Sequence, residues 1–182
     1  MRILIAYAST EGQTRKICRA AADTLIDLHH SVELLPVSEA EGVDPLRFDG
    51  VILGASVHVG AYQPEVIAFG TAHAAALAQR PTLFLAVSLA AAGTDRDEHD
   101  DLDRIARKAF ATMGWTPDRT EQVAGAFRFT EYDFFKGWAM RYIAAQHGQT
   151  VDPHTDTEYT DWAALEAIVT DWAARLPGSG GQ

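Results

Sequence analysis

The sequence predicts an α/β fold with a doubly wound parallel sheet of five strands in the order 2-1-3-4-5. Short apolar runs alternate with helical patterns along the 182 residues, which indicates parallel strands joined by right-handed crossovers. Hydrophobic residues make up 47% of the chain, enough for a full-sized core. We expect one domain over residues 1–176, followed by a flexible tail, PGSGGQ, at 177–182.

Five segments have the character of strands. Three of them are continuous apolar runs, the pattern of strands that are covered on both faces. The second instead alternates, with Val32 and Leu34 on one face. In chain order, the expected strands are 3–8, 31–37, 50–55, 82–88 and 122–129.

Helical patterns fill the gaps between these strands. The first is expected over 14–28, where Ile17 and Leu25 belong to one apolar stripe. The second is expected over 65–78, because Pro64 suits the first turn of a helix.

Two further helices are expected towards the end of the chain. The third covers 101–113 and stops at Gly114, a residue typical of helix C-termini. The last covers 161–176, and both Thr160 and Asp161 can cap its start.

Charge and cysteine content exclude several classes of protein. The net charge of −10 argues against a nucleic-acid partner. The acids concentrated at 94–104 are expected to form a solvated loop and a helix start. A single cysteine, Cys18, permits no internal disulfide and is expected to be a small packed thiol in a reducing cytosol. We see no signal peptide and no transmembrane segment, so a cytoplasmic location is expected.

An extra segment is expected between the fifth strand and the last helix, at about 130–159. It is rich in aromatic and apolar side chains, and we interpret it as a helical insertion. These side chains either pack on a bound ligand or cover the sheet as a flap. The residues concerned are Phe134, Phe135, Trp138, Met140, Tyr142 and Ile143.

The first strand runs into STEGQT, where the first helix starts. Backbone N–H groups at a helix N-terminus and nearby hydroxyls favour a phosphate. The loop contains no lysine or arginine, and it matches neither G-x-x-x-x-G-K-[ST] nor G-x-G-x-x-G. It indicates a monophosphate ester held by neutral donors, or else a simple helix cap. Its residues are Ser9, Thr10, Glu11, Gly12, Gln13 and Thr14.

Two further loops of small residues should meet this one, because ligands bind where the strand order reverses. In GASVHVGAY, Gly54 and Gly60 would let a flat ring approach the backbone, with His58 and Tyr62 at its border. The loop SLAAAGT would line the other side. The candidate residues are Ala55, Ser56, Val57, His58, Gly60, Tyr62, Ser88, Leu89, Ala90 and Ala91.

Several motifs resemble a known family. STEGQT is similar to the flavodoxin phosphate loop, [ST]-x-[ST]-G-x-[ST], with Glu11 at a position where many flavodoxins have threonine. The whole chain looks like the menaquinone-dependent protoporphyrinogen IX dehydrogenases, which are flavodoxin-like enzymes of bacterial haem biosynthesis. GWTPDR (114–119), AGAFRF (124–129) and YTDW (159–162) carry this more specific resemblance.

The resemblance implies a cofactor, a substrate and an acceptor. FMN would be held through its phosphate by the first loop and through its ring by the other two. The substrate would be protoporphyrinogen IX and the acceptor a quinone, menaquinone in this family. The propionates of a porphyrinogen make Arg128, Lys136 and Arg141 candidates for docking it. We assign no catalytic acid or base and no metal ligand.

Two positions depart from the family pattern. His58 stands where the family often has arginine. The inserted helix of the family is often strongly basic, whereas 130–147 carries only Lys136 and Arg141 against Glu131 and Asp133. Peripheral contact with the inner face of the cell membrane therefore has weak support in this chain.

Other functions remain open at this point. One is a flavodoxin-type electron carrier, which the acids at 95–103 favour and the lack of an aromatic in the third loop disfavours. A second is a pyridine-nucleotide-dependent quinone reductase. A third is an interaction module without flavin. The oligomeric state, including a homo-oligomer, is also left open.

Overall fold

The structure, a computed structural model, describes residues 1–127 and 157–177. Its centre is a parallel sheet in the order β2-β1-β3-β5-β6, as predicted. The strands are β1 (Arg2–Tyr7), β2 (Ser31–Pro36), β3 (Gly50–His58), β5 (Thr82–Ser88) and β6 (Arg119–Ala124). Short β4 (Ala61–Tyr62) returns antiparallel to the end of β3.

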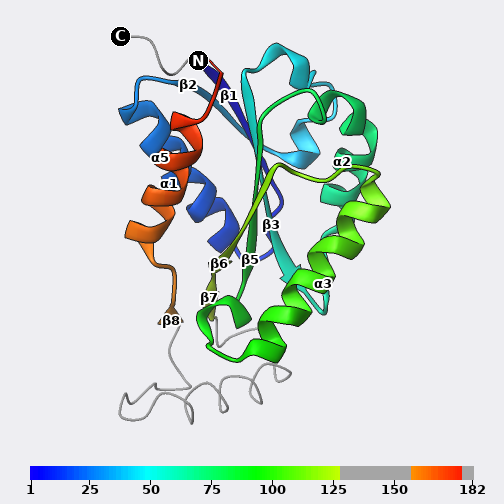
Figure 1. Cartoon of the computed structure of the whole chain (residues 1–182), viewed down its shortest axis with the longest axis vertical. Helices are drawn as coiled ribbons and strands as arrows, with labels where there is room; N and C mark the ends of the chain where they lie inside the picture. The colour runs from blue at the N-terminus through cyan, green and yellow to red at the C-terminus, as the bar shows by residue number, and fades with distance from the viewer. Residues whose placement is uncertain (128–156, 178–182) are drawn as a thin grey trace.

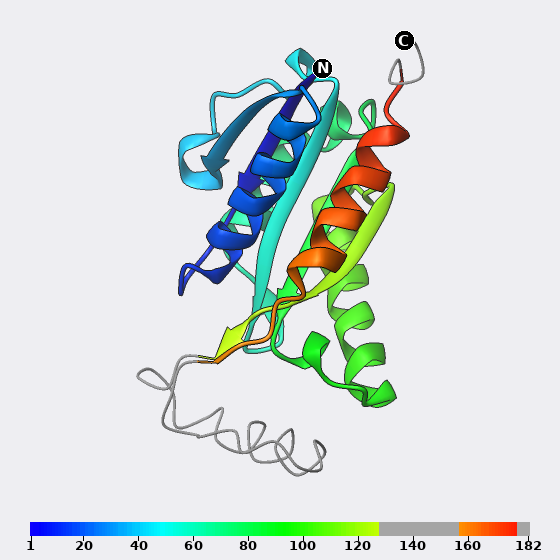
Figure 2. The ribbon, with the colours of Figure 1, turned by 90° about the vertical axis from the view of Figure 1, so that its left-hand side faces the viewer.

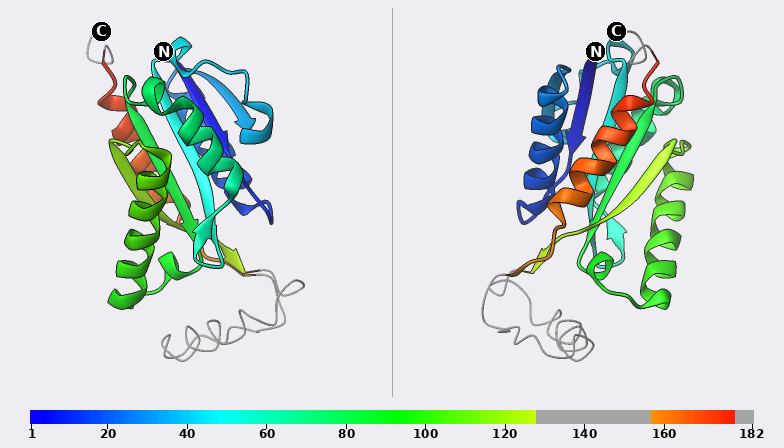
Figure 3. Two further views of the ribbon diagram at one scale, coloured as in Figure 1. Left: turned by 90° about the vertical axis from the view of Figure 1, so that its right-hand side faces the viewer. Right: turned by 60° about the vertical axis from the view of Figure 1, so that its left-hand side comes forward.

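Helices cover both faces of the sheet, as Figure 1 shows edge-on. One layer holds α1 (Gln13–Asp27) and α5 (Trp162–Ala174), which lie side by side in Figure 2. The other holds α2 (Pro64–Leu77) and α3 (Arg96–Met113), seen in the left view of Figure 3. Single 3₁₀ turns form η1 (Val37–Glu39), η2 (Pro45–Arg47) and η3 (Ala90–Ala92).

The core has two halves, one on each face of the sheet. Alternate residues of the central strands point to opposite faces, so Leu53 and Phe84 pack towards α2 and α3. Ile52 and Leu85 pack towards α1 and α5. The strands are apolar on both faces for this reason, which explains the continuous apolar runs of the sequence.

Helix α3 starts five residues earlier than expected, at Arg96. The side chain of Asp95 accepts a hydrogen bond from the N–H of Asp97 at 2.9 Å and caps the helix. Asp97 and Glu98 then occupy the first turn, where the helix dipole favours negative charge. Residues 94–104 were predicted to be a solvated loop and a helix start; the helix start is confirmed, but it lies at Arg96 and takes up most of the expected loop.

The fifth strand is also displaced from its expected place at 122–129. The strand pairs with β5 from Arg119 and ends at Ala124. The guanidinium of Arg119 lies 2.6 Å from the carboxylate of Glu121 and 2.7 Å from that of Asp171. The chain then leaves the sheet as β7 (Ala126–Phe127), which pairs antiparallel with β8 (Thr157–Glu158).

Within the described ranges, 1–127 and 157–177, no helix is both long and apolar enough to cross a membrane. In the same ranges, no cluster of three or more His, Cys, Asp or Glu side chains is arranged to hold a metal ion.

Candidate functional site

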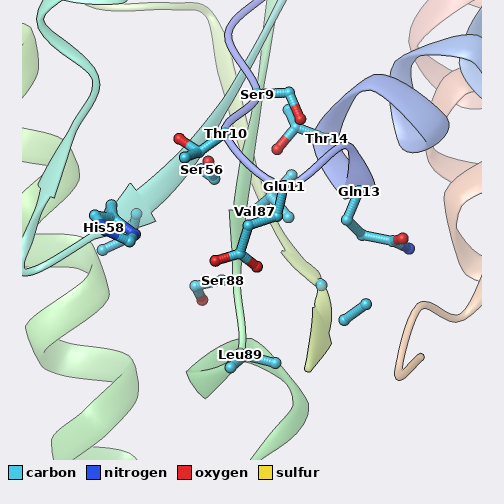
Figure 4. A pocket seen from close by; sticks show the side chains of 13 residues that line it. Ser9, Thr10, Glu11, Gln13, Thr14, Ser56, His58, Val87, Ser88 and Leu89 are labelled. Atoms are coloured by element: carbon cyan, nitrogen blue, oxygen red, sulfur yellow. The ribbon is translucent and has the colours of Figure 1, made fainter. Parts of the chain in front are cut away.

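A cavity of about 80 Å³ lies at the carboxyl ends of β1, β3 and β5, where the strand order reverses (Figure 4). This is the place predicted from the arrangement of the three loops. Its lining residues are Ser9, Thr10, Glu11, Gln13, Thr14, Ser56, Val57, His58, Val87, Ser88, Leu89, Gly125 and Ala126.

The first loop presents hydroxyls and the start of α1 to this cavity. Gly12 has φ 89°, a left-handed conformation that suits glycine, and no side chain caps the helix. The N–H of Gly12 donates to Ser9 Oγ at 3.0 Å, so the hydroxyl proton of Ser9 is left for another acceptor. None of the described lining residues is a lysine or arginine, so the first loop donates from neutral hydroxyl and backbone N–H groups.

Gln13 turns its amide away from the hydroxyl side of the cavity (Figure 4). Its Nε2 donates to Thr160 Oγ1 at 2.9 Å, and both side chains are buried. Thr160 was expected to help cap the last helix. Instead Asp161 alone accepts from the N–H of Ala164 at 2.9 Å, and the hydroxyl of Thr160 donates to Ala124 O at 2.7 Å.

Glu11 lies in the same loop and extends its carboxylate towards the carboxyl end of β5 (Figure 4). On the opposite wall, His58 comes from the end of β3. The cavity therefore combines hydroxyl donors with one carboxylate and one imidazole.

The second loop is a tight hairpin between β3 and β4. Val59 and Gly60 have φ 49° and 75°, so the tip of this hairpin is left-handed at both residues. Tyr62 was expected beside the ligand but is buried, with its ring edge-on to Phe84 at 5.1 Å between centroids. Burial, and after it the charge of Asp103, raises the pKa of Tyr62.

Gln63 is a residue that the sequence did not single out. Its Nε2 donates to Ser56 Oγ at 2.5 Å and to Thr10 Oγ1 at 3.4 Å. It therefore ties the first loop to the second across the cavity. No local pattern identifies this residue, because its partners lie in two separate segments.

Gly54 was expected to let a flat ring approach the backbone, but it makes room for α1 instead. A Cβ at this position would lie 2.3 Å from Cys18 Sγ, so the missing side chain lets α1 pack on β3. The expectation that Gly54 opens the backbone to a flat ring is therefore wrong. Ala55 beside it is fully buried in the core on the other face.

The wall of the cavity near the third loop, SLAAAGT, is formed only partly by the residues expected there. Val87, Gly125 and Ala126 line the cavity, although the sequence did not nominate them. The N–H of Gly125 donates to Ser88 O at 2.9 Å, which brings the end of β6 against β5. The run of small residues in AGAFRF was the available signal.

The remaining nominated residues fall into two groups. Some lie near the cavity without lining it: Gly12, Ala55, Gly60, Tyr62, Ala90 and Ala91. The three candidates for the substrate, Arg128, Lys136 and Arg141, lie outside the described residues.

Comparison with known proteins finds relatives of this chain. The flavodoxin domain model matches residues 4–154. The protoporphyrinogen IX dehydrogenase [quinone] of Escherichia coli strain K12 is 30% identical over 162 residues, 89% of each chain. The protein of the same name from Leishmania major is 26% identical over 174 residues, 95% of this chain and 75% of its own.

Solved flavodoxins share the fold. Oxidised flavodoxin 1 of Bacillus cereus aligns over 97% of this chain and 100% of its own, with a TM-score of 0.57 and 12% identity. The flavodoxin of Streptococcus pneumonia TIGR4 covers the same shares, with a TM-score of 0.55 and 19% identity. The chain therefore belongs to the flavodoxin domain family and, within it, to the group of proteins named protoporphyrinogen IX dehydrogenase [quinone].

Proposed function

We propose that this protein binds FMN in the cavity, oxidises protoporphyrinogen IX to protoporphyrin IX and passes the electrons to a quinone. We propose menaquinone as that electron acceptor. The observation that carries the proposal is the similarity over 89% of both chains to an enzyme of that name. The hydroxyl-rich cavity at the switch point, whose described lining holds no lysine or arginine, supports the cofactor.

The donor set fits a phosphate monoester. The hydroxyls of Ser9, Thr10 and Thr14 lie around the N-terminus of α1, where the helix dipole favours an anion. A triphosphate or pyrophosphate would call for a cation or for a glycine-rich turn, and this loop has neither. We therefore assign the phosphate of FMN to the first loop.

The ring of the cofactor would extend from this loop between the other two walls. Ser56 and His58 on one side and Ser88 and Leu89 on the other would border it. When bound, the flavin supplies the hydride acceptor. The chain's own part is to hold the phosphate, orient the ring and offer hydrogen bonds from Ser56 and His58 to its polar edge.

A flavodoxin-type electron carrier is the second candidate function. Its support is the acidic N-terminal end of α3, where Asp95, Asp97 and Glu98 stand near the loop that follows β5. Such a surface would suit a basic redox partner. The two functions differ in whether the protein turns over a substrate of its own.

Two measurements test the proposal. The purified protein should show a flavin absorbance spectrum, or gain one when FMN is added. Under anaerobic conditions, porphyrin fluorescence should rise only when the protein, protoporphyrinogen IX and menaquinone are all present, with omission of the quinone as the control. Bound flavin without stimulated porphyrin formation would favour the carrier. A protein that fails to take up FMN would contradict the cofactor assignment.

A further inference from the structure

The motif YTDW binds the carboxyl end of β6 directly beside the cavity. The N–H of Tyr159 donates to Gly125 O at 3.0 Å, and the hydroxyl of Thr160 donates to Ala124 O at 2.7 Å. Gly125 lines the cavity. The motif therefore has a place in the site that capping of α5 by Asp161 does not account for.

The hydroxyl of Thr160 has a fixed direction. A carbonyl oxygen can only accept, so the single proton of Thr160 is committed to Ala124 O. Its oxygen must then accept from Gln13, which must present its NH₂ group. The pair is 8% and 9% exposed, so water cannot replace either bond without rearrangement.

A second set of contacts, nearer the surface, also joins the first turn of α1 to the segment before α5. Lys16, one turn after Gln13, lies 2.5 Å from Glu158 and 5.0 Å from the centroid of the Trp162 ring. Trp162 Nε1 also donates to Glu158 at 2.8 Å. Hydrogen bonds from Lys16, and after it from Trp162 and Gln13, lower the pKa of Glu158.

These contacts join the first turn of α1 to β6 and to the segment before α5. The first loop, Gly125 and Ser88 all line the cavity, so these contacts link the wall formed by the first loop to the wall formed by the ends of β5 and β6. The amide of Gln13 hydrogen-bonds Thr160 in this junction and does not point at the expected ligand.

We propose that Thr160 is a positioning residue for the phosphate site: it holds the amide of Gln13 away from the loop hydroxyls and sets the first turn of α1 so that these hydroxyls meet the phosphate of FMN. The inference rests on the proposed function, since it takes FMN as the ligand. Gln13 then acts through Thr160 and not as a direct phosphate ligand.

Comparison of FMN with riboflavin, which lacks the phosphate, tests this role. Thr160→Val keeps the shape of the side chain and removes both hydrogen bonds. We expect about tenfold weaker FMN binding, because the shifted loop would lose the equivalent of one ordinary hydrogen bond to the phosphate. Riboflavin affinity should stay unchanged. Thr160→Ser should restore FMN affinity to within about twofold. Gln13→Met should weaken FMN binding at least as much as Thr160→Val, because it also removes the hydrogen bond to Glu158, and the double variant should bind FMN no more weakly than Gln13→Met alone.

Thr24→Val is the matched control, because Thr24 also bonds a carbonyl, Ala20 O at 3.1 Å, on the same helix away from the cavity. It should leave both affinities unchanged. Equal losses of FMN and riboflavin affinity in Thr160→Val would reduce Thr160 to a general structural role. Loss of FMN affinity in Gln13→Met but not in Thr160→Val would make Gln13 a direct ligand and overturn the inference. A wild-type protein that binds neither compound would refute the proposed function instead.

Discussion

Cys18 and Gly54 lie where α1 packs closely on β3, with no room for a Cβ at Gly54. Cys18 is fully buried, and its burial raises the pKa of the thiol to about 12. It faces the one backbone position of β3 at which α1 could not tolerate a Cβ. The cysteine therefore serves packing, as its alanine-rich surroundings in the sequence predicted.

A substitution at Gly54 measures this contact. Gly54→Ala should lower the free energy of unfolding by about 1–3 kcal/mol, because the new methyl group overpacks against the thiol. Adding Cys18→Ala removes the sulfur and should recover part of the loss. Urea unfolding of both variants gives the comparison, and Gly42→Ala, where nothing lies within 4 Å of a Cβ, is the control. If Gly54→Ala were as stable as the wild type, the close approach of α1 would be wrong.

The hydroxyls of Thr10 and Thr14 offer a second test among single residues. If both donate to the phosphate of FMN, Thr10→Ala combined with Thr14→Ala should weaken FMN binding, each lost bond to a charged group costing about 1.5–3 kcal/mol. Titration of the apoprotein with FMN checks this value, and riboflavin binding serves as the comparison. Unchanged FMN affinity would place the phosphate elsewhere.

Among the elements, β8 connects α1 with α5. Glu158 on β8 bonds both Lys16 of α1 and Trp162 at the start of α5. This ion pair is partly exposed, so its contribution to stability is about 1 kcal/mol or less. It also depends on pH, because the pKa of Glu158 is lower in the folded protein than the ordinary glutamate value of 4.5.

The sign of this dependence follows from linkage. A carboxyl whose pKa is depressed by folding stabilises the folded state above its unfolded pKa and loses that contribution as the pH falls through the folded value. Wild-type protein should exceed Glu158→Gln in stability at pH 7, and the difference should shrink below about pH 4.5. Thermal unfolding at several pH values checks this, with Glu41→Gln, on an exposed loop residue, as the control. A difference that stayed constant down to pH 3 would contradict the ion pair.

The elements that the sequence predicted well are those with a local cause. The apolar runs of β1, β3 and β5 predicted both the strands and their burial, and alternation with helices predicted the sheet order. The start of α3 was missed because one capping residue, Asp95, turns an acidic stretch into a helix. β7 was merged with the expected fifth strand and β8 was missed, because each has two residues and depends on a partner some 30 positions away.

The candidate site shows the same division. The three loops and their meeting point were predicted, since both follow from strand order. A small residue, however, looks the same whether it makes room for a ligand or for a helix, and Gly54 was misassigned for that reason. The links of Gln13 to Thr160 and of Gln63 to Thr10 connect distant segments, which no single stretch of sequence reveals.

In the whole molecule, β7 and β8 mark where the chain leaves the sheet and returns to it (Figures 1 and 2). Paired residues of antiparallel strands have Cα atoms only about 5 Å apart, so Phe127 and Thr157 can be joined by a two-residue turn. Replacing residues 128–156 with Asn-Gly should therefore leave a folded protein. Circular dichroism and FMN titration would check the shortened chain, and loss of the fold would show that the sheet depends on the removed residues.

Porphyrin formation by the same variant distinguishes cofactor binding from substrate recognition. If FMN binding persists while porphyrinogen oxidation falls, the substrate is recognised by residues 128–156, among which Arg128, Lys136 and Arg141 are our candidates. Full activity in the shortened protein would assign substrate recognition to the cavity walls.

The narrow ribbon of β7 and β8 also has an evolutionary consequence. Because the chain departs and re-enters at neighbouring positions, a different segment whose two ends lie equally close together would fit there without moving β7 or β8. A lineage of flavodoxin-fold proteins could thereby acquire, replace or discard an entire recognition module in one genetic event. The old scaffold would meanwhile continue to fold and to bind its cofactor.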